Sequence, residues 1–84
     1  MLDRAGILRG DMEALDAATC FVLSDIQSNF DVFIQEFPIE SVHEIPEYAN
    51  YTLACFFAEL AWYLPPSQRA RLHELKRALS LLPV

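Results

Sequence analysis

A long apolar segment, residues 48–64, constrains the fold of this chain more than any other feature. Only Asn50, Thr52 and Glu59 interrupt the segment with polar groups. As an α-helix it is apolar on nearly every side, and such a helix has to be buried on all sides, either in protein or in lipid. The chain has 84 residues, enough for one domain that buries only ~60–65% of its unfolded surface. The question of function therefore begins with what covers this segment.

The first half of the chain has the spacing of a helix. Apolar residues recur there every three or four positions. Asp11 suits an N-cap, and Pro38 disfavours helical geometry at the residue before it. We therefore predict one long helix over about 11–36, with Ser28-Asn29 as the place where it would bend or break.

Prolines delimit two further helices. Pro46 suits the first turn of a central helix over about 46–64, and Pro65-Pro66 forces a turn after it. Leucines spaced by three and four residues then predict a C-terminal helix over about 66–82. Three helices with short connections predict an all-α fold, a small antiparallel three-helix bundle.

Residues 11–84 are expected to form a single helical domain, preceded by a flexible N-terminal arm over 1–10. Gly6 and Gly10 disfavour a long helix in the arm, which leaves a frayed segment or a short turn of helix with Ile7 and Leu8 docked on the core. Hydrophobic residues make up 54% of the chain, more than so thin a core uses. Large exposed apolar patches usually mark interaction surfaces, so we expect dimerisation, as a homodimer, or an obligate partner to complete the bundle.

Charge is sorted along the chain. The six basic residues lie near its ends, and none lies between Asp11 and Gln68. The net charge of −6 argues against nucleic acid as a partner, because phosphate binding needs a basic surface. The acidic stretch is interpreted as a solvated face, as a surface that the basic third helix packs against, or as a surface that attracts a basic partner protein. The residues assigned to this acidic surface are Asp16, Asp25, Asp31 and Glu36.

One short motif has the spacing of metal ligands. Glu40-Ser-Val-His43 matches the Glu-x-x-His pattern of di-metal helical bundles, and Glu44 is close by. The motif lies between two prolines, however, and a second such pair is lacking, so a polar loop with a capping role is favoured over a metal site. The chain also lacks a glycine-rich phosphate loop, and no catalytic motif stands out. We therefore expect neither a cofactor nor an enzyme.

The two cysteines are predicted to be buried and inert. Cys20 and Cys55 both lie within apolar helical pattern, and in a helical hairpin they would be ~10 Å or more apart along the helix axes at 1.5 Å per residue. That separation disfavours a disulfide. Cysteines of this kind and the lack of a signal-peptide pattern in residues 1–10 lead us to expect a cytoplasmic location.

Glu59 is the only charged residue of the apolar segment, and it is expected on a strip of the helix that reaches solvent.

A membrane-spanning helix is the lipid alternative for residues 48–64. Tyr48 and Tyr51 near one end and Trp62 and Tyr63 at the other resemble the aromatic belts of such helices. The segment is nevertheless short, ~25 Å as a helix, and it would place Glu59 within the hydrocarbon. A cover of protein is therefore favoured over lipid.

These observations predict a small acidic helical module for protein–protein interaction, a regulator or inhibitor that acts by binding another protein. Aromatic residues dominate the energetics of such interfaces. The candidate interface residues are those of the apolar segment: Tyr48, Tyr51, Phe56, Phe57, Trp62 and Tyr63. The alternatives are a metal-binding helical protein that uses Glu40 and His43, and a small single-span membrane protein built on residues 48–64.

Overall fold

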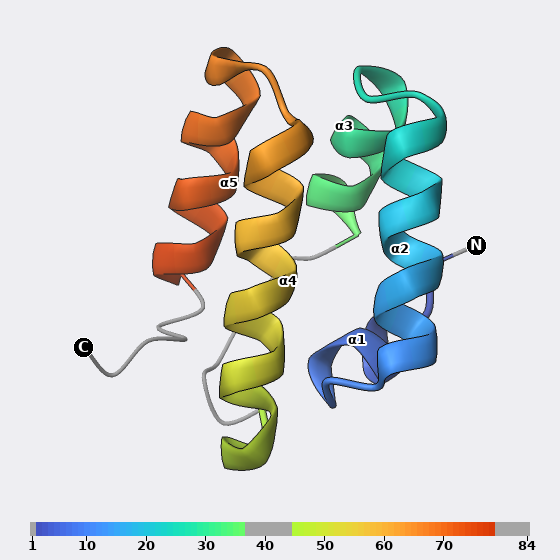
Figure 1. The fold of residues 1–84 in the computed structure, drawn as a ribbon, viewed down its shortest axis with the longest axis vertical. Helices are drawn as coiled ribbons and strands as arrows, with labels where there is room; N and C mark the ends of the chain where they lie inside the picture. The colour runs from blue at the N-terminus through green and yellow to red at the C-terminus, as the bar shows by residue number, and fades with distance from the viewer. Residues whose placement is uncertain (1, 37–44, 79–84) are drawn as a thin grey trace.

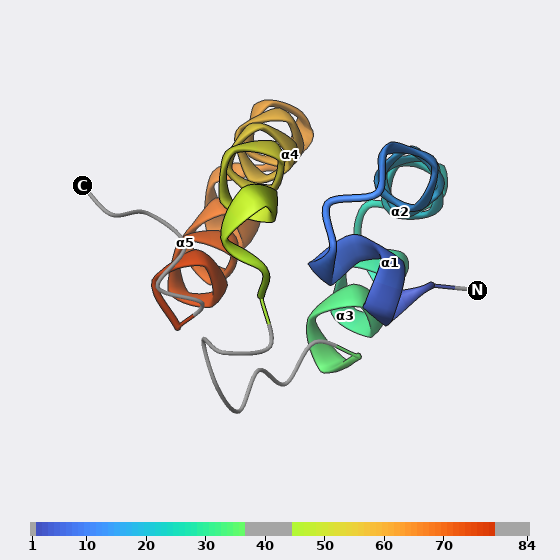
Figure 2. The ribbon, with the colours of Figure 1, turned by 90° about the horizontal axis from the view of Figure 1, so that it is seen from below.

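The computed structural model describes residues 2–36 and 45–78, and these residues form helices without any strand. The elements are α1 (Arg4–Leu8), α2 (Met12–Ser24), α3 (Ser28–Gln35), the short 3₁₀ helix η2 (Glu47–Ala49), α4 (Asn50–Tyr63) and α5 (Pro66–Ala78). Figure 1 shows two antiparallel helix pairs, α2 with α3 and α4 with α5. In Figure 2, α2 and α4 lie on one side of the molecule, with α1 and α3 on the other side. The predicted all-α fold is thus confirmed for the described residues.

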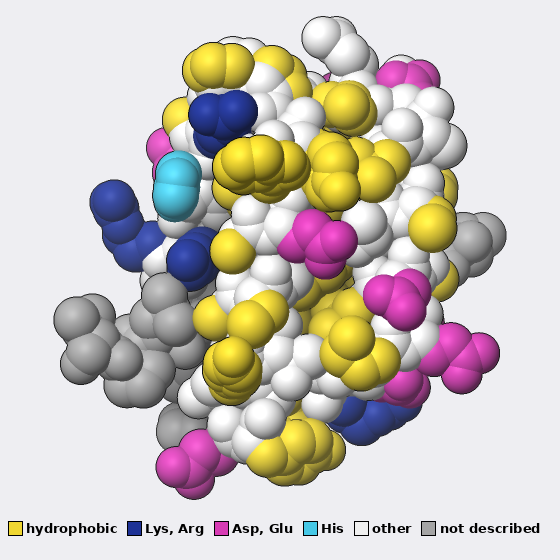
Figure 3. Space-filling model, viewed as in Figure 1, with side chains coloured by type: hydrophobic (Ala, Val, Ile, Leu, Met, Phe, Trp, Pro, Cys, Tyr) yellow, Lys and Arg dark blue, Asp and Glu magenta, His cyan; other side chains and the backbone are white. Residues whose placement is uncertain are grey.

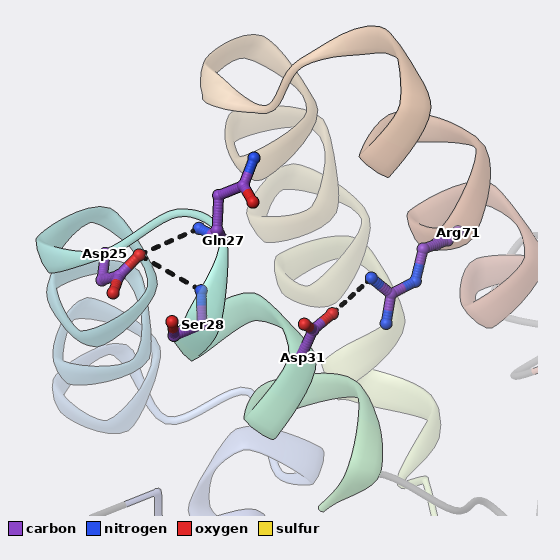
Figure 4. Close-up of polar contacts among 5 residues, drawn as sticks. All are labelled: Asp25, Gln27, Ser28, Asp31 and Arg71. Carbon is purple, nitrogen blue, oxygen red and sulfur yellow. Dashed lines mark hydrogen bonds and ion pairs between the residues drawn. The ribbon is translucent and has the colours of Figure 1, made fainter.

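The prediction of one long helix over 11–36 is wrong, because the chain turns at Asp25–Gln27. Asp25 has an extended backbone, and its Oδ1 accepts hydrogen bonds from the backbone N–H groups of Gln27 and Ser28, both at 3.1 Å (Figure 4). Side-chain acceptors of this kind compete with the helical ladder and begin a new helix instead. Within residues 2–36 and 45–78, five α-helices therefore take the place of the predicted three-helix bundle.

A second set of polar contacts holds this turn in place. The Nδ2 group of Asn29 donates to the Phe21 carbonyl oxygen at 2.6 Å and lies 2.7 Å from the Ser24 hydroxyl. The carbonyls at the end of α2 lack helical partners, and Asn29 satisfies one of them from the next helix. Since α2 and α3 both bury apolar residues in one core, the helical spacing of the sequence continues across the break.

Helix α1 closes the core at the N-terminal side. Of the two forms expected for residues 1–10, the structure has the short helix, with Ile7 and Leu8 buried in the core. The helix ends at Leu8 with Arg9 as its C-cap. Gly10 follows with a φ of 74° and donates its backbone N–H to Ile7 O, while Asp11 N–H donates to Gly6 O. This is the Schellman pattern, which needs the left-handed conformation that glycine adopts freely. Asp11 then caps α2 as predicted, accepting from Glu13 N–H at 3.1 Å.

The two helices delimited by prolines form close to where the sequence predicts them. The central helix of 46–64 appears as η2 followed by α4, and α5 begins at Pro66. The rest of the predicted 66–82 helix, after Ala78, lies outside the described residues. Within 2–36 and 45–78, no helix has the length and apolar character needed to cross a membrane.

The core is built around phenylalanine rings from α3 and α4. The Phe33 ring centroid lies 6.2 Å from that of Phe30 and 5.9 Å from that of Phe56, and Phe56 lies 5.4 Å from Phe57. These spacings are those of favourable aromatic pairs. The rings join the two helix pairs of Figure 1, so the side of α4 that carries Phe56 and Phe57 is fixed inward.

Candidate interaction surface

Helix α4 buries one side and leaves the other open to solvent in the described chain. The inward side carries Leu53, Phe56, Phe57 and Leu60. The opposite side and the preceding turn η2 carry an exposed row of residues, called here the α4 stripe: Tyr48 from η2, and Tyr51, Cys55, Ala58 and Trp62 from α4. Steps of three or four residues place these side chains on one helical face. The described part of the chain therefore covers about half of the apolar segment.

The aromatic members of the stripe are strongly exposed. Tyr48 and Tyr51 each expose 73% of their surface, and Trp62 exposes 81%. Tyr63, next to Trp62 but on another side of the helix, exposes 48%. Figure 3 shows hydrophobic side chains distributed along the outer surface of α4. Large aromatic side chains so placed are unusual on a monomer and typical of interaction surfaces.

Two of the six candidate interface residues lie elsewhere. Phe56 and Phe57 are only 4% and 2% exposed, because they pack in the core against α3. A helix that is apolar on nearly every side carries little amphipathic signal, so the sequence does not indicate which aromatic residues face outward. The exposed candidates are Tyr48, Tyr51, Trp62 and Tyr63.

A groove next to the stripe separates α4 from α2. It has a volume of about 80 Å³, far below the ~300–1,000 Å³ of typical small-molecule pockets. Figure 3 shows acidic side chains over this region, with hydrophobic side chains between and below them. The lining residues are Met12, Leu15, Asp16 and Thr19 from α2, and Thr52, Cys55, Phe56 and Glu59 from α4. A groove of this size accommodates one or two side chains of a partner.

The groove carries negative charge on both sides. Asp16 lies on α2 and Glu59 lies on α4, and both are exposed. This placement confirms the prediction that Glu59 reaches solvent. Neither helix contains a lysine or an arginine. The sequence predicts that Asp16 belongs to an acidic surface. It does not indicate that Met12, Thr19 and Thr52 line the same groove.

The other predicted acidic residues have structural partners or positions away from the groove. Asp31 on α3 pairs with Arg71 on α5, whose guanidinium also lies 5.3 Å from the centre of the Phe30 ring (Figure 4). Glu36 lies at the end of α3 and is half-buried. An arginine of the basic last helix thus contacts an acidic helix of the same chain, in the sense of one of the arrangements expected from the charge pattern.

Asp25 stabilises the turn between α2 and α3 through its carboxylate. Hydrogen bonds from the backbone N–H and hydroxyl of Ser28, and then from Gln27 N–H, stabilise the carboxylate and hold the pKa of Asp25 below its ordinary value of 3.8. A lowered pKa in the folded state contributes stability above the unfolded pKa, and this contribution is lost as the pH falls through the folded pKa.

We predict that Asp25→Asn, which keeps a capping oxygen but removes the charge, lowers the urea midpoint of unfolding at neutral pH. The difference from wild type should shrink as the pH falls from 3.8 through the lower pKa of the folded state, where the wild-type carboxylate also becomes neutral. Urea titrations of both proteins across the acid range measure this. A gap between the two midpoints that stays constant with pH would contradict the assigned role of the carboxylate.

The prediction that both cysteines are buried is wrong. Cys20 and Cys55 are free thiols with exposed side chains. Cys55 lies on the outer side of α4 and lines the groove, whereas Cys20 lies on α2 and is not part of the lining. Their apolar sequence surroundings suggested burial, but each occupies a helix face that no described element covers.

Metal binding was one alternative raised by the sequence, and the described residues bear on it in part. Within 2–36 and 45–78, no group of three or more His, Cys, Asp or Glu side chains is placed to hold a metal ion. Glu40 and His43, the residues of the metal alternative, lie outside the described residues. A shallow depression of about 430 Å³ near α5 is lined by Ala58, Ala61, Trp62 and Arg69, and the Nε group of Arg69 already donates to Leu64 O at 2.8 Å.

Comparison of the chain with protein-family models, with curated proteins and with solved structures finds no match in any of the three. Function is therefore inferred from the surface itself. Its distinctive features are the α4 stripe and the acidic groove beside it.

Proposed function

We propose that the protein is a small acidic helical interaction module, a regulator or inhibitor that binds another protein through the α4 stripe. One observation carries this proposal: Trp62 and Tyr51 stand 81% and 73% exposed on the same face of a well-packed helix. Tryptophan and tyrosine are the residues that most often dominate binding energy at protein interfaces. Burying a large apolar side chain contributes about 1.5–3 kcal/mol, so covering both residues would favour binding strongly.

The support beneath the stripe also suits binding. Leu53, Phe57 and Leu60 anchor the inward side of α4 in the core, so the outward side is held by a rigid helix. A rigid surface loses little conformational entropy when a partner binds it. Tyrosine and tryptophan add large contact area with only two rotatable side-chain bonds each. The stripe is therefore organised before any partner arrives.

Affinity capture from the native host tests the proposal. The bait is the full chain, compared with Tyr51→Ser/Trp62→Ser and with Val32→Ser, a matched apolar-to-serine change at an exposed position of α3. All three should show the same helical circular dichroism, because the changed side chains lie on the surface. A partner retained by wild type and Val32→Ser but lost by the double variant supports the proposal. Equal retention by all three baits, or no specific partner for any, would contradict it.

Self-association through the same stripe is the second candidate, since two copies could cover each other's Tyr51 and Trp62. Sedimentation velocity at micromolar concentration tests it. A dimer that dissociates in the Tyr51→Ser/Trp62→Ser variant would assign the stripe to a homodimer. A compact monomer would end the homodimer proposal and leave the stripe to a different protein.

A further inference from the structure

We infer that the groove between α2 and α4 receives a basic amphipathic helix of the partner protein, with apolar side chains in the groove and lysine or arginine side chains at Asp16 and Glu59. The inference rests on the proposed function, because it names the kind of partner that binds beside the α4 stripe. Two features of the groove carry it, its shape and its charge.

The groove has the form of a helix-binding site. Its inner part contains the buried residues Leu15 and Phe56, and the flexible side chain of Met12 lies at one edge. Helices α2 and α4 lie side by side and run in the same direction (Figures 1 and 2). Two such helices offer a channel along which a third helix can lay an apolar stripe of i, i+3, i+4 and i+7 spacing, with one or two of its side chains entering the groove as anchors. The volume of about 80 Å³ suits such anchors and not a cofactor.

The charges of the groove select the sign of the partner. Asp16 and Glu59 stand on opposite helices, so a helix between them would present one flank to each carboxylate. Figure 3 shows the acidic side chains over α2 and α4, while the lysine and arginine side chains lie towards the margins of this face. Complementary charges speed association and exclude partners of the wrong sign. A helix with basic flanks therefore fits, and one with acidic flanks is repelled.

A second copy of this chain fits the groove less well. Its α2 and α4 would bring acidic residues against Asp16 and Glu59, and like charges at an interface are destabilising. Its basic amphipathic helix α5 is already engaged, since Leu72 is buried in the core and Arg71 pairs with Asp31. A partner with a free basic helix meets neither obstacle.

A peptide titration with two thiol reporters tests the inference on the full chain. The probe is a synthetic Leu/Lys peptide with leucines at helical i, i+3, i+4, i+7 spacing. Its controls are the same peptide with glutamate for lysine, and a scrambled Leu/Lys peptide without the apolar stripe. The Cys20→Ser variant reports the reaction rate of Cys55 in the groove with a maleimide, and Cys55→Ser reports Cys20 outside it.

The Leu/Lys peptide is expected to slow the labelling of Cys55 several-fold and to leave Cys20 unchanged, with little effect from either control peptide. In a Cys20→Ser background, the peptide concentration that gives half-maximal protection should rise about tenfold in the Asp16→Asn/Glu59→Gln variant. This factor corresponds to the loss of two modest surface charge pairs. Protection by the glutamate or scrambled peptide, or undiminished protection in the neutralised variant, would overturn the inference.

Two further outcomes separate this inference from the proposed function. If Cys55 is already unreactive without peptide, a second copy or another part of the chain occupies the groove, and the inference fails. If the Leu/Lys peptide gives no protection while the Tyr51→Ser/Trp62→Ser bait still loses its captured partner, the inference fails and the proposed function stands, with the partner seated on the stripe alone.

Discussion

Replacing Phe33 with alanine is expected to lower the free energy of unfolding by about 3–5 kcal/mol, the usual loss for a buried phenylalanine. The Phe33 side chain is fully buried, and its ring contacts Phe30 on the same helix and Phe56 on α4. The change leaves a cavity where the two helix pairs meet. A chain of 84 residues has a total stability of about 4–13 kcal/mol, so the variant should be partly or largely unfolded.

Urea unfolding followed by circular dichroism measures this loss. Val32→Ala is the matched control, because Val32 is the neighbouring residue on α3 but is 38% exposed. The control should stay within about 0.5 kcal/mol of wild type, as surface substitutions usually do. If Phe33→Ala were no more destabilising than Val32→Ala, the packing of α3 against α4 described here would be incorrect.

Replacing Gly10 with valine is expected to cost about 2–5 kcal/mol, the second largest effect. Gly10 has a φ of 74°, a conformation that costs an L-residue roughly 1–2 kcal/mol and suits a β-branched residue least. A Cβ at this position would also lie 3.2 Å from Ala49 Cβ and 3.3 Å from Thr52 Cβ. Overpacking of this kind typically adds 1–3 kcal/mol.

Gly10→Asn separates the two causes in the same urea experiment. Asparagine tolerates the left-handed conformation better than other residues with a side chain, but it still carries a Cβ. We expect its loss of stability to fall between those of wild type and Gly10→Val. A Gly10→Val protein as stable as wild type would contradict both the Schellman end of α1 and the close approach of the α1–α2 corner to α4.

Much of the fold can be predicted from local signals in the sequence. Pro46 and Pro65-Pro66 delimit the central helix because proline fixes its own backbone and restricts the residue before it. The α2–α3 turn is harder to predict, since both helices face one core and the apolar spacing does not change there. Its signal lies in Asp25 and Asn29, whose side chains compete with the helical backbone.

The candidate site can be predicted only in part. The sequence identifies α4 as the helix that needs a cover, but Phe56 and Trp62 are equally apolar in a helix with little amphipathic signal. Which of them points outward depends on how the rings of α3 pack against α4. The groove depends on tertiary packing as well, because Asp16 and Glu59 line one groove only when α2 lies beside α4.

Photo-cross-linking from the α4 stripe in the native host tests most directly whether this surface binds another protein chain. Ala58→p-benzoylphenylalanine places the cross-linker on the stripe while keeping Tyr51 and Trp62, and Val32→p-benzoylphenylalanine places it on α3, on the other side of the molecule. We predict a discrete cross-linked protein from position 58 and none from position 32. Irradiation that yields no adduct from position 58, or the same adducts from both positions, would contradict the assignment of the α4 stripe as the interaction surface.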